Sequence, residues 1–175
     1  MKLSDVFALR QSCREFTAEQ ITDQQLETIL RAAYAAPAAR GGYDGLHLSV
    51  LQNAEALERW TQIFREMTGD SEGDPIHGAP TLIVASESGE QPALRIAEDA
   101  AVLVENMHLA ATSLGLGSFY IMGLVMLTRE NPEVSELLKL PEGYVPAAAL
   151  AVGYSAKELT AREIVDGKIS TIVIK

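Results

Sequence analysis

The chain has 175 residues, 47% of them hydrophobic and 22% charged, which is the balance of a single globular domain over residues 1–175 with an apolar core. Lysine and arginine total 14 against 24 aspartate and glutamate, a formal net charge of −10, and this sign disfavours nucleic acid and anionic membranes as partners. The single cysteine, Cys13, excludes an internal disulfide framework, and no apolar stretch reaches the roughly 18 residues of a membrane span, so a cytoplasmic protein is expected.

The N-terminal part of the chain predicts two helices. The first is expected over Leu3–Arg10. The second has Thr22 as its N-cap with Gln25 as capping-box partner, and Pro37 ends it. Its inward face, at helical spacing, is predicted to be Leu26, Ile29, Leu30 and Ala33.

The next stretch predicts a loop, a strand and a third helix. The composition of Arg40–Gly45 is that of a loop. Leu46–Leu51 alternates apolar residues with His47 and Ser49, which indicates a half-buried strand with its apolar residues facing inward. From Asn53 a helix is expected. Its apolar face comprises Leu57, Trp60, Phe64 and Met67.

The second half of the chain predicts buried strands around one long helix. Thr81–Ala85 is apolar and short enough for a fully buried strand. The long helix runs from near Ala93 to Leu114 and is apolar almost all round, so we expect it to be buried. Further strands are expected over Ser118–Met122, Ala147–Val152 and Ser170–Ile174, with a short helix opened by Asn131 and Pro132. This order indicates an α+β chain with a sheet between helices.

Motifs for familiar chemistries are absent from the sequence. Leu114–Gly117 has two glycines of a dinucleotide loop, but Tyr120 stands in the place of the third and a helix precedes the turn. The scattered His47, His77 and His108 are interpreted as ordinary strand, loop or core residues. No metal ligand set and no catalytic acid, base or nucleophile is therefore predicted.

One segment, Arg10–Phe16, stands out in this acidic chain. It places two arginines and the hydroxyl of Ser12 within a few residues. Guanidinium forks and a hydroxyl suit a phosphate monoester, which favours charge-assisted and bidentate donors. The residues alone leave two interpretations open, a phosphate site or a pair of surface arginines in ordinary ion pairs.

The pattern Arg10-x-Ser12-x-Arg14-x-Phe16, followed by a helix ending in Ala35-Ala36-Pro37, resembles the N-terminal signature of the FMN-dependent nitroreductase family. Further matches occur in the family's order: Ala79-Pro80, Asp99-Ala100-Ala101, Asn106 with Ala110-Ala111, Leu114-Gly115-Leu116-Gly117, Gly123, Leu140-Pro141-Glu142 and Val152-Gly153-Tyr154. Residues 157–165 are similar to the tail of the short members. The resemblance spans nearly the whole chain.

This resemblance implies a three-layer α/β/α fold with a central mixed, mainly antiparallel sheet, in an intertwined homodimer. One FMN is expected in each of two sites at the subunit interface. At the C-terminal end, Arg162 matches a basic residue that completes the phosphate site. The strand Ser170–Ile174 resembles the extension that family members lay onto the partner's sheet.

The resemblance also implies which residues bind FMN. Arg10, Ser12 and Arg14 match the positions that hold its phosphate and ribityl chain. The main-chain N–H of Met122 or Gly123 matches the donor that approaches flavin N5. The full predicted set is Arg10, Gln11, Ser12, Arg14, Pro37, Ala38, Ala39, Gly41, Ile121, Met122, Gly123 and Arg162.

One stretch departs from the family pattern, which after the Ala-Pro pair usually runs S-x-x-N-x-Q-P-W-x-F. Here Ala38 has no hydroxyl, and Gly41 or Gly42 occupies the asparagine position. Arg40 and Tyr43 are the candidate replacement donors.

The function implied by the resemblance is an FMN-dependent oxidoreductase. NAD(P)H would deliver a hydride to flavin N5 and leave, and a nitroaromatic, quinone or flavin-type acceptor would then take the electrons in a ping-pong sequence. Two alternatives stay open. One is a flavin-binding or structural dimer with little turnover, and the other is a different reaction on the same scaffold, such as dehydrogenation or reductive dehalogenation.

Overall fold

A four-stranded antiparallel sheet forms the middle layer of the computed structural model, which describes residues 1–90 and 93–175. The strands are β1 (Leu46–Leu51), β2 (Thr81–Ser88), β3 (Gly117–Ile121) and β4 (Tyr144–Gly153). Their order is β1-β2-β4-β3, with neighbours paired at Leu51↔Leu82, Thr81↔Val152 and Gly117↔Gly153. An isolated parallel bridge joins Ser12 to Ser118 beside β3. The mainly antiparallel sheet is thereby confirmed.

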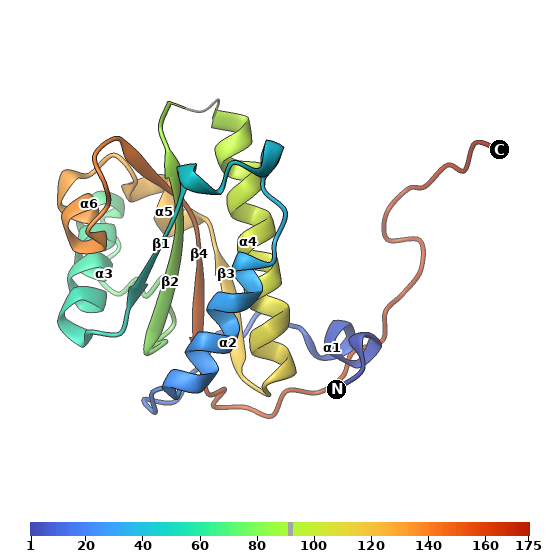
Figure 1. Ribbon diagram of the computed structural model, residues 1–175. Helices are drawn as coiled ribbons and strands as arrows, with labels where there is room; N and C mark the ends of the chain where they lie inside the picture. The colour runs from blue at the N-terminus through green and yellow to red at the C-terminus, as the bar shows by residue number, and fades with distance from the viewer. Residues whose placement is uncertain (91–92) are drawn as a thin grey trace.

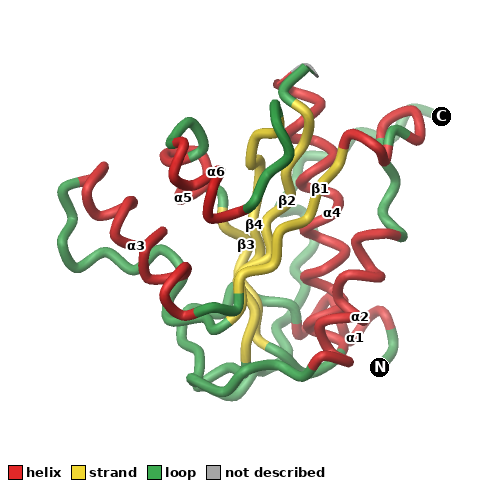
Figure 2. The backbone as a smooth tube through the Cα atoms, turned by 60° about the vertical axis from the view of Figure 1, so that its left-hand side comes forward, coloured by secondary structure: helices red, strands yellow, loops and turns green. Residues whose placement is uncertain are grey.

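Helices cover both faces of this sheet (Figures 1 and 2). They are α1 (Leu3–Leu9), α2 (Asp23–Tyr34), α3 (Ala54–Thr68), α4 (Ala93–Ser113), α5 (Gly123–Thr128) and α6 (Pro132–Leu138). Helices α2 and α4 pack on one face around Ile29, Val104 and Met107. Helices α3, α5 and α6 pack on the other, around Trp60 and Val134. The central strands β2 and β4 are buried because both faces are covered, so the predicted three layers are confirmed.

Local sequence signals fix the helix ends where they were expected. The Gln25 N–H donates to the Thr22 hydroxyl (3.2 Å) and the Thr22 N–H donates to the Gln25 side chain (2.8 Å), which completes the capping box of α2. Gly115 follows α4 with a positive φ of 77°, which glycine adopts without strain. The Asn131 side chain accepts from the Glu133 N–H (2.9 Å) and caps α6.

Several local predictions were wrong. In β1 the polar Ser49 is buried, because its hydroxyl donates to the Leu138 carbonyl of α6 (2.7 Å), whereas Val50 is exposed. On α3, Met67 is exposed and Ile63 is buried. Helix α5 was not predicted, because six residues are too few to show a period.

The predicted C-terminal strand over Ser170–Ile174 was also wrong for the single chain. These residues have no strand structure, and Ile174 is 93% exposed. A strand needs a neighbouring edge, and beyond its contact with Ala8 the C-terminal tail runs away from the body of the molecule (Figure 1). Among the described residues, no helix combines the length and the apolarity needed to cross a bilayer.

Candidate functional site

The Arg10–Arg14 segment lies extended along the outer edge of β3. Ser12 forms the parallel bridge to Ser118, and the Cys13 N–H donates to the Ser118 carbonyl (2.9 Å). Successive side chains of an extended segment point to opposite sides. By this alternation Arg10, Ser12 and Arg14 are expected on one side, since Ser12 and Arg14 are exposed while Cys13 is only 6% exposed. The Arg14 guanidinium lies over the Phe119 ring of β3, 4.7 Å from its centroid.

Close packing of Cys13 on β3 holds this segment in place. A Cβ atom added to Gly117 would lie 2.7 Å from the Cys13 Sγ, so the thiol occupies space that only a glycine leaves open. The next residues continue the pairing, because the Ala156 N–H donates to the Glu15 carbonyl and the Thr17 N–H to the Tyr154 carbonyl (both 2.9 Å). The segment is thus anchored on both β3 and the end of β4.

The C-terminal segment returns to the same place. The Arg162 N–H donates to the Ala8 carbonyl (3.0 Å), and the Gln11 side chain donates to the Thr160 carbonyl (3.3 Å). The main chain of Arg162 therefore lies beside the residues that precede Arg10.

Two polar residues of α4, the buried His108 and the exposed Glu105, lie beside the main chain of the segment. His108 is 1% exposed, its Nε2 is 3.4 Å from the Gln11 carbonyl oxygen, and its Nδ1 is 3.7 Å from the Glu105 Oε2. The His108 ring, and after it the charge of Arg10, lower the pKa of Glu105 against the opposing effect of burial. Burial and the charge of Glu105 raise the pKa of Tyr120. These groups therefore lie within electrostatic reach of one another.

The sequence interpretation missed His108 as a site residue. A Glu and a His three residues apart on an otherwise apolar helix was the available signal. No three His, Cys, Asp or Glu side chains gather to hold a metal ion in the described part of the chain.

The predicted residues Pro37, Ala38, Ala39 and Gly41 lie at the other end of α4 (Figure 1). The Ala39 N–H donates to the Asp99 carboxylate (3.0 Å), whereas the Arg10–Arg14 segment contacts α4 at His108. These two α4 residues are nine positions apart, about 13 Å along the helix axis. The two parts of the predicted site therefore lie at different levels of α4.

The loop that carries these residues is built locally. Arg40 and Gly41 have positive φ values of 58° and 68°. The Tyr43 hydroxyl donates to the Ala36 carbonyl (3.1 Å), so it braces the loop.

The remaining predicted residues, Ile121, Met122 and Gly123, form the junction between β3 and α5. The Ile121 side chain is buried in the core, so only its main chain is available to a ligand. Met122 and Gly123 are exposed, and the exposed Met126 and Leu127 extend this surface along α5. Since β3 rises about 3.3 Å per residue, the junction lies about 13 Å along the strand from Ser118. One strand thus joins a positively charged end to an open turn with apolar side chains.

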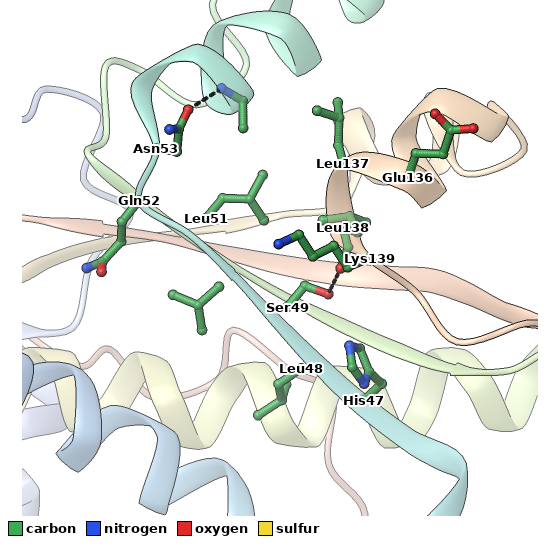
Figure 3. A pocket seen from close by; sticks show the side chains of 12 residues that line it. His47, Leu48, Ser49, Leu51, Gln52, Asn53, Glu136, Leu137, Leu138 and Lys139 are labelled. Atoms are coloured by element: carbon green, nitrogen blue, oxygen red, sulfur yellow. Dashed lines mark hydrogen bonds between the residues drawn. The ribbon is translucent and has the colours of Figure 1, made fainter.

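A groove of about 630 Å³ lies elsewhere, between β1, the start of α3 and the end of α6 (Figure 3). His47, Ser49 and Lys139 are among its lining residues, and none of the predicted cofactor residues is. β1 is the edge strand opposite β3, three strand spacings or about 14 Å away. The groove is therefore separate from the Arg10–Arg14 segment.

Comparison with known proteins gives a consistent result. A family model described as the nitroreductase family matches residues 8–154. An Archaeoglobus fulgidus protein provisionally named an NADH dehydrogenase/NAD(P)H nitroreductase is 30% identical over 152 residues, covering 85% of this chain and 83% of that protein. The oxygen-insensitive NADPH nitroreductase of Salmonella typhimurium is 31% identical over 163 residues, covering 83% of this chain but 62% of that enzyme. The crystal structure of a nitroreductase with bound FMN from Bacteroides fragilis superposes with a TM-score of 0.84 at 26% identity, covering 99% of this chain and 100% of that one.

Proposed function

The chain belongs to the nitroreductase family, and from that premise we propose that it is an FMN-dependent NAD(P)H oxidoreductase. The observation that carries the proposal is the extended Arg10–Arg14 segment, which is fixed to β3, the strand that ends at the open Met122–Gly123 turn. The names of the relatives and the FMN in the similar structure support the same assignment.

The residues present fit the phosphate end of FMN. Two guanidinium groups and a hydroxyl on one side of an extended segment supply charge-assisted donors to a phosphate monoester. Arg162 joins them through its main-chain contact with Ala8. In a chain with a net charge of −10, such a group of arginines is the place where an anion is favoured.

The residues at the β3–α5 junction fit the ring end. FMN, when bound, supplies the redox chemistry, taking a hydride from NAD(P)H and passing electrons to a nitroaromatic, quinone or flavin-type acceptor. The main-chain N–H of Met122 or Gly123 is assigned as the donor toward flavin N5, where a fixed donor stabilises negative charge. The exposed side chains of Met122 and Met126 offer an apolar surface to a planar reductant or acceptor. Because the protein only has to bind the flavin, orient it and tune its reactivity, it needs no catalytic base or nucleophile of its own.

We propose that a second copy of the chain completes the site, as in the homodimer that the family resemblance implies. Within one chain the Pro37–Gly41 loop is about 13 Å along α4 from the level of the arginines. We therefore place FMN at the interface of a cytoplasmic homodimer, with each domain of residues 1–175 contributing Arg10–Arg14 to one site and its loop to the other. The exposed apolar tail, including Ile172 and Ile174, is assigned to the partner's sheet.

A second candidate is a flavin-binding dimer with little turnover. It is favoured by the altered loop, where Ala38 offers no hydroxyl and the Ala39 N–H is engaged by Asp99. Dehydrogenation or reductive dehalogenation on the same scaffold remains the other alternative.

Reconstitution and anaerobic reduction test the proposal. The apoprotein is titrated with FMN, and the holoprotein is mixed with NADH or NADPH in a stopped-flow absorbance instrument. Uptake of one FMN per chain and rapid bleaching of the flavin band are expected. FMN uptake without bleaching would favour the low-turnover dimer, and no uptake would contradict the assignment altogether.

A further inference from the structure

A buried histidine lies beneath the main chain that joins Arg10 to Ser12. His108 projects from α4, and its Nε2 contacts the Gln11 carbonyl oxygen at 3.4 Å. A carbonyl oxygen only accepts hydrogen bonds, so this contact requires the proton on Nε2. A polar ring this deeply buried is costly without such a partner.

The other side of the ring faces Glu105, with 3.7 Å between Nδ1 and Oε2. This distance exceeds a hydrogen bond, so Glu105 acts on the ring through its charge. Glu105 is in turn within the field of Arg10. His108 therefore lies between a carboxylate on its own helix and the peptide that precedes Ser12.

The Gln11 peptide is the hinge of the predicted phosphate site. The Gln11 carbonyl belongs to the planar peptide unit that joins Gln11 to Ser12, so a contact that holds this oxygen restricts the orientation of the main chain at both residues. The Gln11 side chain donates to the Thr160 and Leu9 carbonyls (3.3 Å each). Its main-chain carbonyl has a separate contact with His108.

We propose that His108 is a positioning residue for the cofactor phosphate: its Nε2–H holds the Gln11 carbonyl so that Arg10 and Ser12 converge on one phosphate. This inference rests on the proposed function, and it concerns only the phosphate end of the cofactor. Donors fixed before binding lose less freedom when the ligand arrives, and affinity depends on that.

A matched pair of substitutions tests it. The amide nitrogen of glutamine falls near the position of Nε2, and that of asparagine near the position of Nδ1. His108→Gln therefore keeps the donor to Gln11, whereas His108→Asn moves it toward Glu105. The variant His108→Leu removes both.

The readout compares FMN with riboflavin, which lacks the phosphate. Dissociation constants of both are measured with each apoprotein by quenching of flavin fluorescence, and the fold is checked by circular dichroism. We expect His108→Leu and His108→Asn to weaken FMN by about 2- to 12-fold, the effect of one hydrogen bond. Riboflavin binding should change less than twofold, and His108→Gln should retain FMN affinity.

Each other outcome overturns the inference. Equal losses for FMN and riboflavin would show that His108 only supports the fold, and unchanged FMN binding in all variants would show that its contact is irrelevant. Retention by asparagine but not glutamine would assign the role to the Glu105 side. If a leucine variant does not fold, the glutamine–asparagine pair decides. A wild-type protein that binds FMN more tightly than riboflavin upholds the proposed function even when the histidine inference fails, whereas one that binds neither contradicts both.

Discussion

At the scale of single residues, the predicted phosphate site depends on a side chain that faces away from it. Cys13 points into β3, and the alternation of an extended segment then turns its neighbours Ser12 and Arg14 outward. Gly117 makes this possible because it leaves room for the thiol. The pairing of Ser12 with Ser118 therefore determines both which side chains of the segment pack on β3 and which are predicted to bind the phosphate.

Substitution of Arg10 tests the binding side. Arg10→Ala should weaken FMN by about 1.5–3 kcal/mol, the scale of a hydrogen bond to a charged group. The dissociation constant is measured by fluorescence titration, with Arg31→Ala as the matched control. Arg31 is an exposed arginine on α2 whose carboxylate partner, Glu27, is 4.0 Å away. An equal effect of both substitutions would reduce Arg10 to a general contribution of charge.

Substitution of Gly117 tests the packing side. In Gly117→Ala the new methyl would lie 2.7 Å from the Cys13 Sγ, so the segment must shift, at a cost of about 1–3 kcal/mol in the free energy of unfolding. Urea denaturation measures this cost. Gly45→Ala is the control, because a Cβ there meets nothing within 4 Å. The double variant with Cys13→Ala should recover part of the loss, and no recovery would show that the thiol is not the obstacle.

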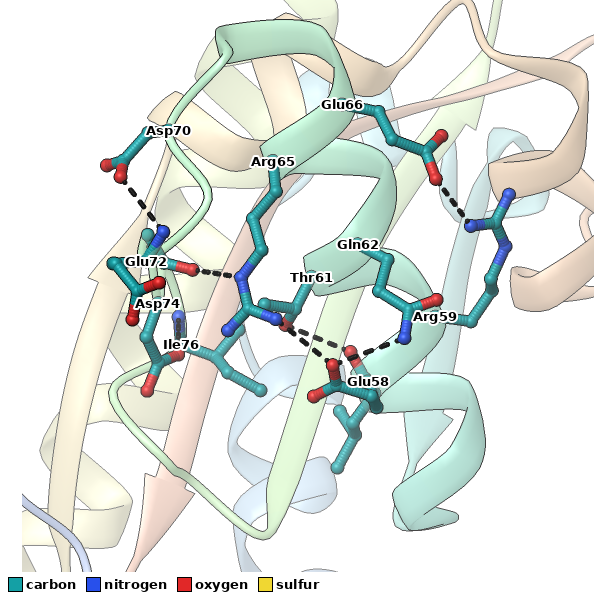
Figure 4. A network of polar contacts seen from close by, with 12 residues as sticks. Glu58, Arg59, Thr61, Gln62, Arg65, Glu66, Asp70, Glu72, Asp74 and Ile76 are labelled. Atoms are coloured by element: carbon teal, nitrogen blue, oxygen red, sulfur yellow. Dashed lines mark hydrogen bonds and ion pairs between the residues drawn. The ribbon is translucent and has the colours of Figure 1, made fainter.

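At the scale of elements, α3 is joined to α6 by a bidentate ion pair. The Arg59 Nη2 donates to the Glu133 Oε2 at 2.7 Å, and its Nη1 also contacts Glu66 at 3.0 Å. On the other side of α3, Arg65 donates to Glu58 and to the Gly73 carbonyl, which ties the loop over residues 69–80, between α3 and β2, to the helix (Figure 4). Single exposed ion pairs contribute little to the free energy of unfolding. Here, however, the two arginines of α3 connect the helix to α6 on one side and to the Gly73 carbonyl on the other.

The ion pair between Arg59 and Glu133 predicts that part of the free energy of unfolding is lost in acid. The hydrogen bonds from Arg59 lower the pKa of Glu133 from its ordinary value of 4.5 in the folded state. A carboxylate with a lowered folded-state pKa stabilises the fold above its unfolded pKa, and that stabilisation disappears as the pH falls through the folded value. Glu133→Gln should therefore be less stable than wild type at pH 7, and the difference should shrink in acid and in high salt.

Urea denaturation across this pH range measures the difference. Glu130→Gln is the control. Within the described residues, Glu130 accepts a hydrogen bond from the adjacent Arg129, and this contact does not connect two helices. A gap between wild type and Glu133→Gln that stays constant down to pH 3 would contradict the titration of Glu133 as its cause.

Elements with local signals were predictable from the sequence, and those that depend on tertiary contacts were not. The capping box of α2 and the length of α4 are local, and both are confirmed. The expectation that α4 is buried all round was wrong for the single chain, in which Val102 is 36% exposed. The inward face of β1 was wrong because Ser49 finds its partner on α6, far along the chain. For the candidate site, Arg10–Arg14 was recognisable in the sequence as a cluster of charge. The contact of His108 with the Gln11 carbonyl depends on the fold, because the two residues are far apart in the chain, and it could not be predicted.

At the scale of the whole molecule, two features point outward to another copy. The Pro37–Gly41 loop and the arginine segment lie at different levels of α4, and the tail carries apolar side chains into solvent, with Ile172, Val173 and Ile174 all exposed. Isolated strand-forming residues gain no hydrogen bonds until they meet a sheet edge. The strand predicted over Ser170–Ile174 is therefore a property expected of the assembly.

Removal of the tail tests this dependence. A chain that ends at Ile169 lacks the predicted strand, so we expect weaker dimerisation in sedimentation equilibrium. A parallel loss of FMN affinity is also expected, because in the proposed dimer each site includes the partner's loop. The control is the double variant Asp166→Ala and Lys168→Ala, which changes exposed charged residues of the same tail and leaves its apolar end intact. If the full chain is a monomer that binds one FMN with the same affinity as the shortened chain, the shared site is wrong. If dimerisation falls while FMN affinity stays, the two copies associate but do not complete each other's sites.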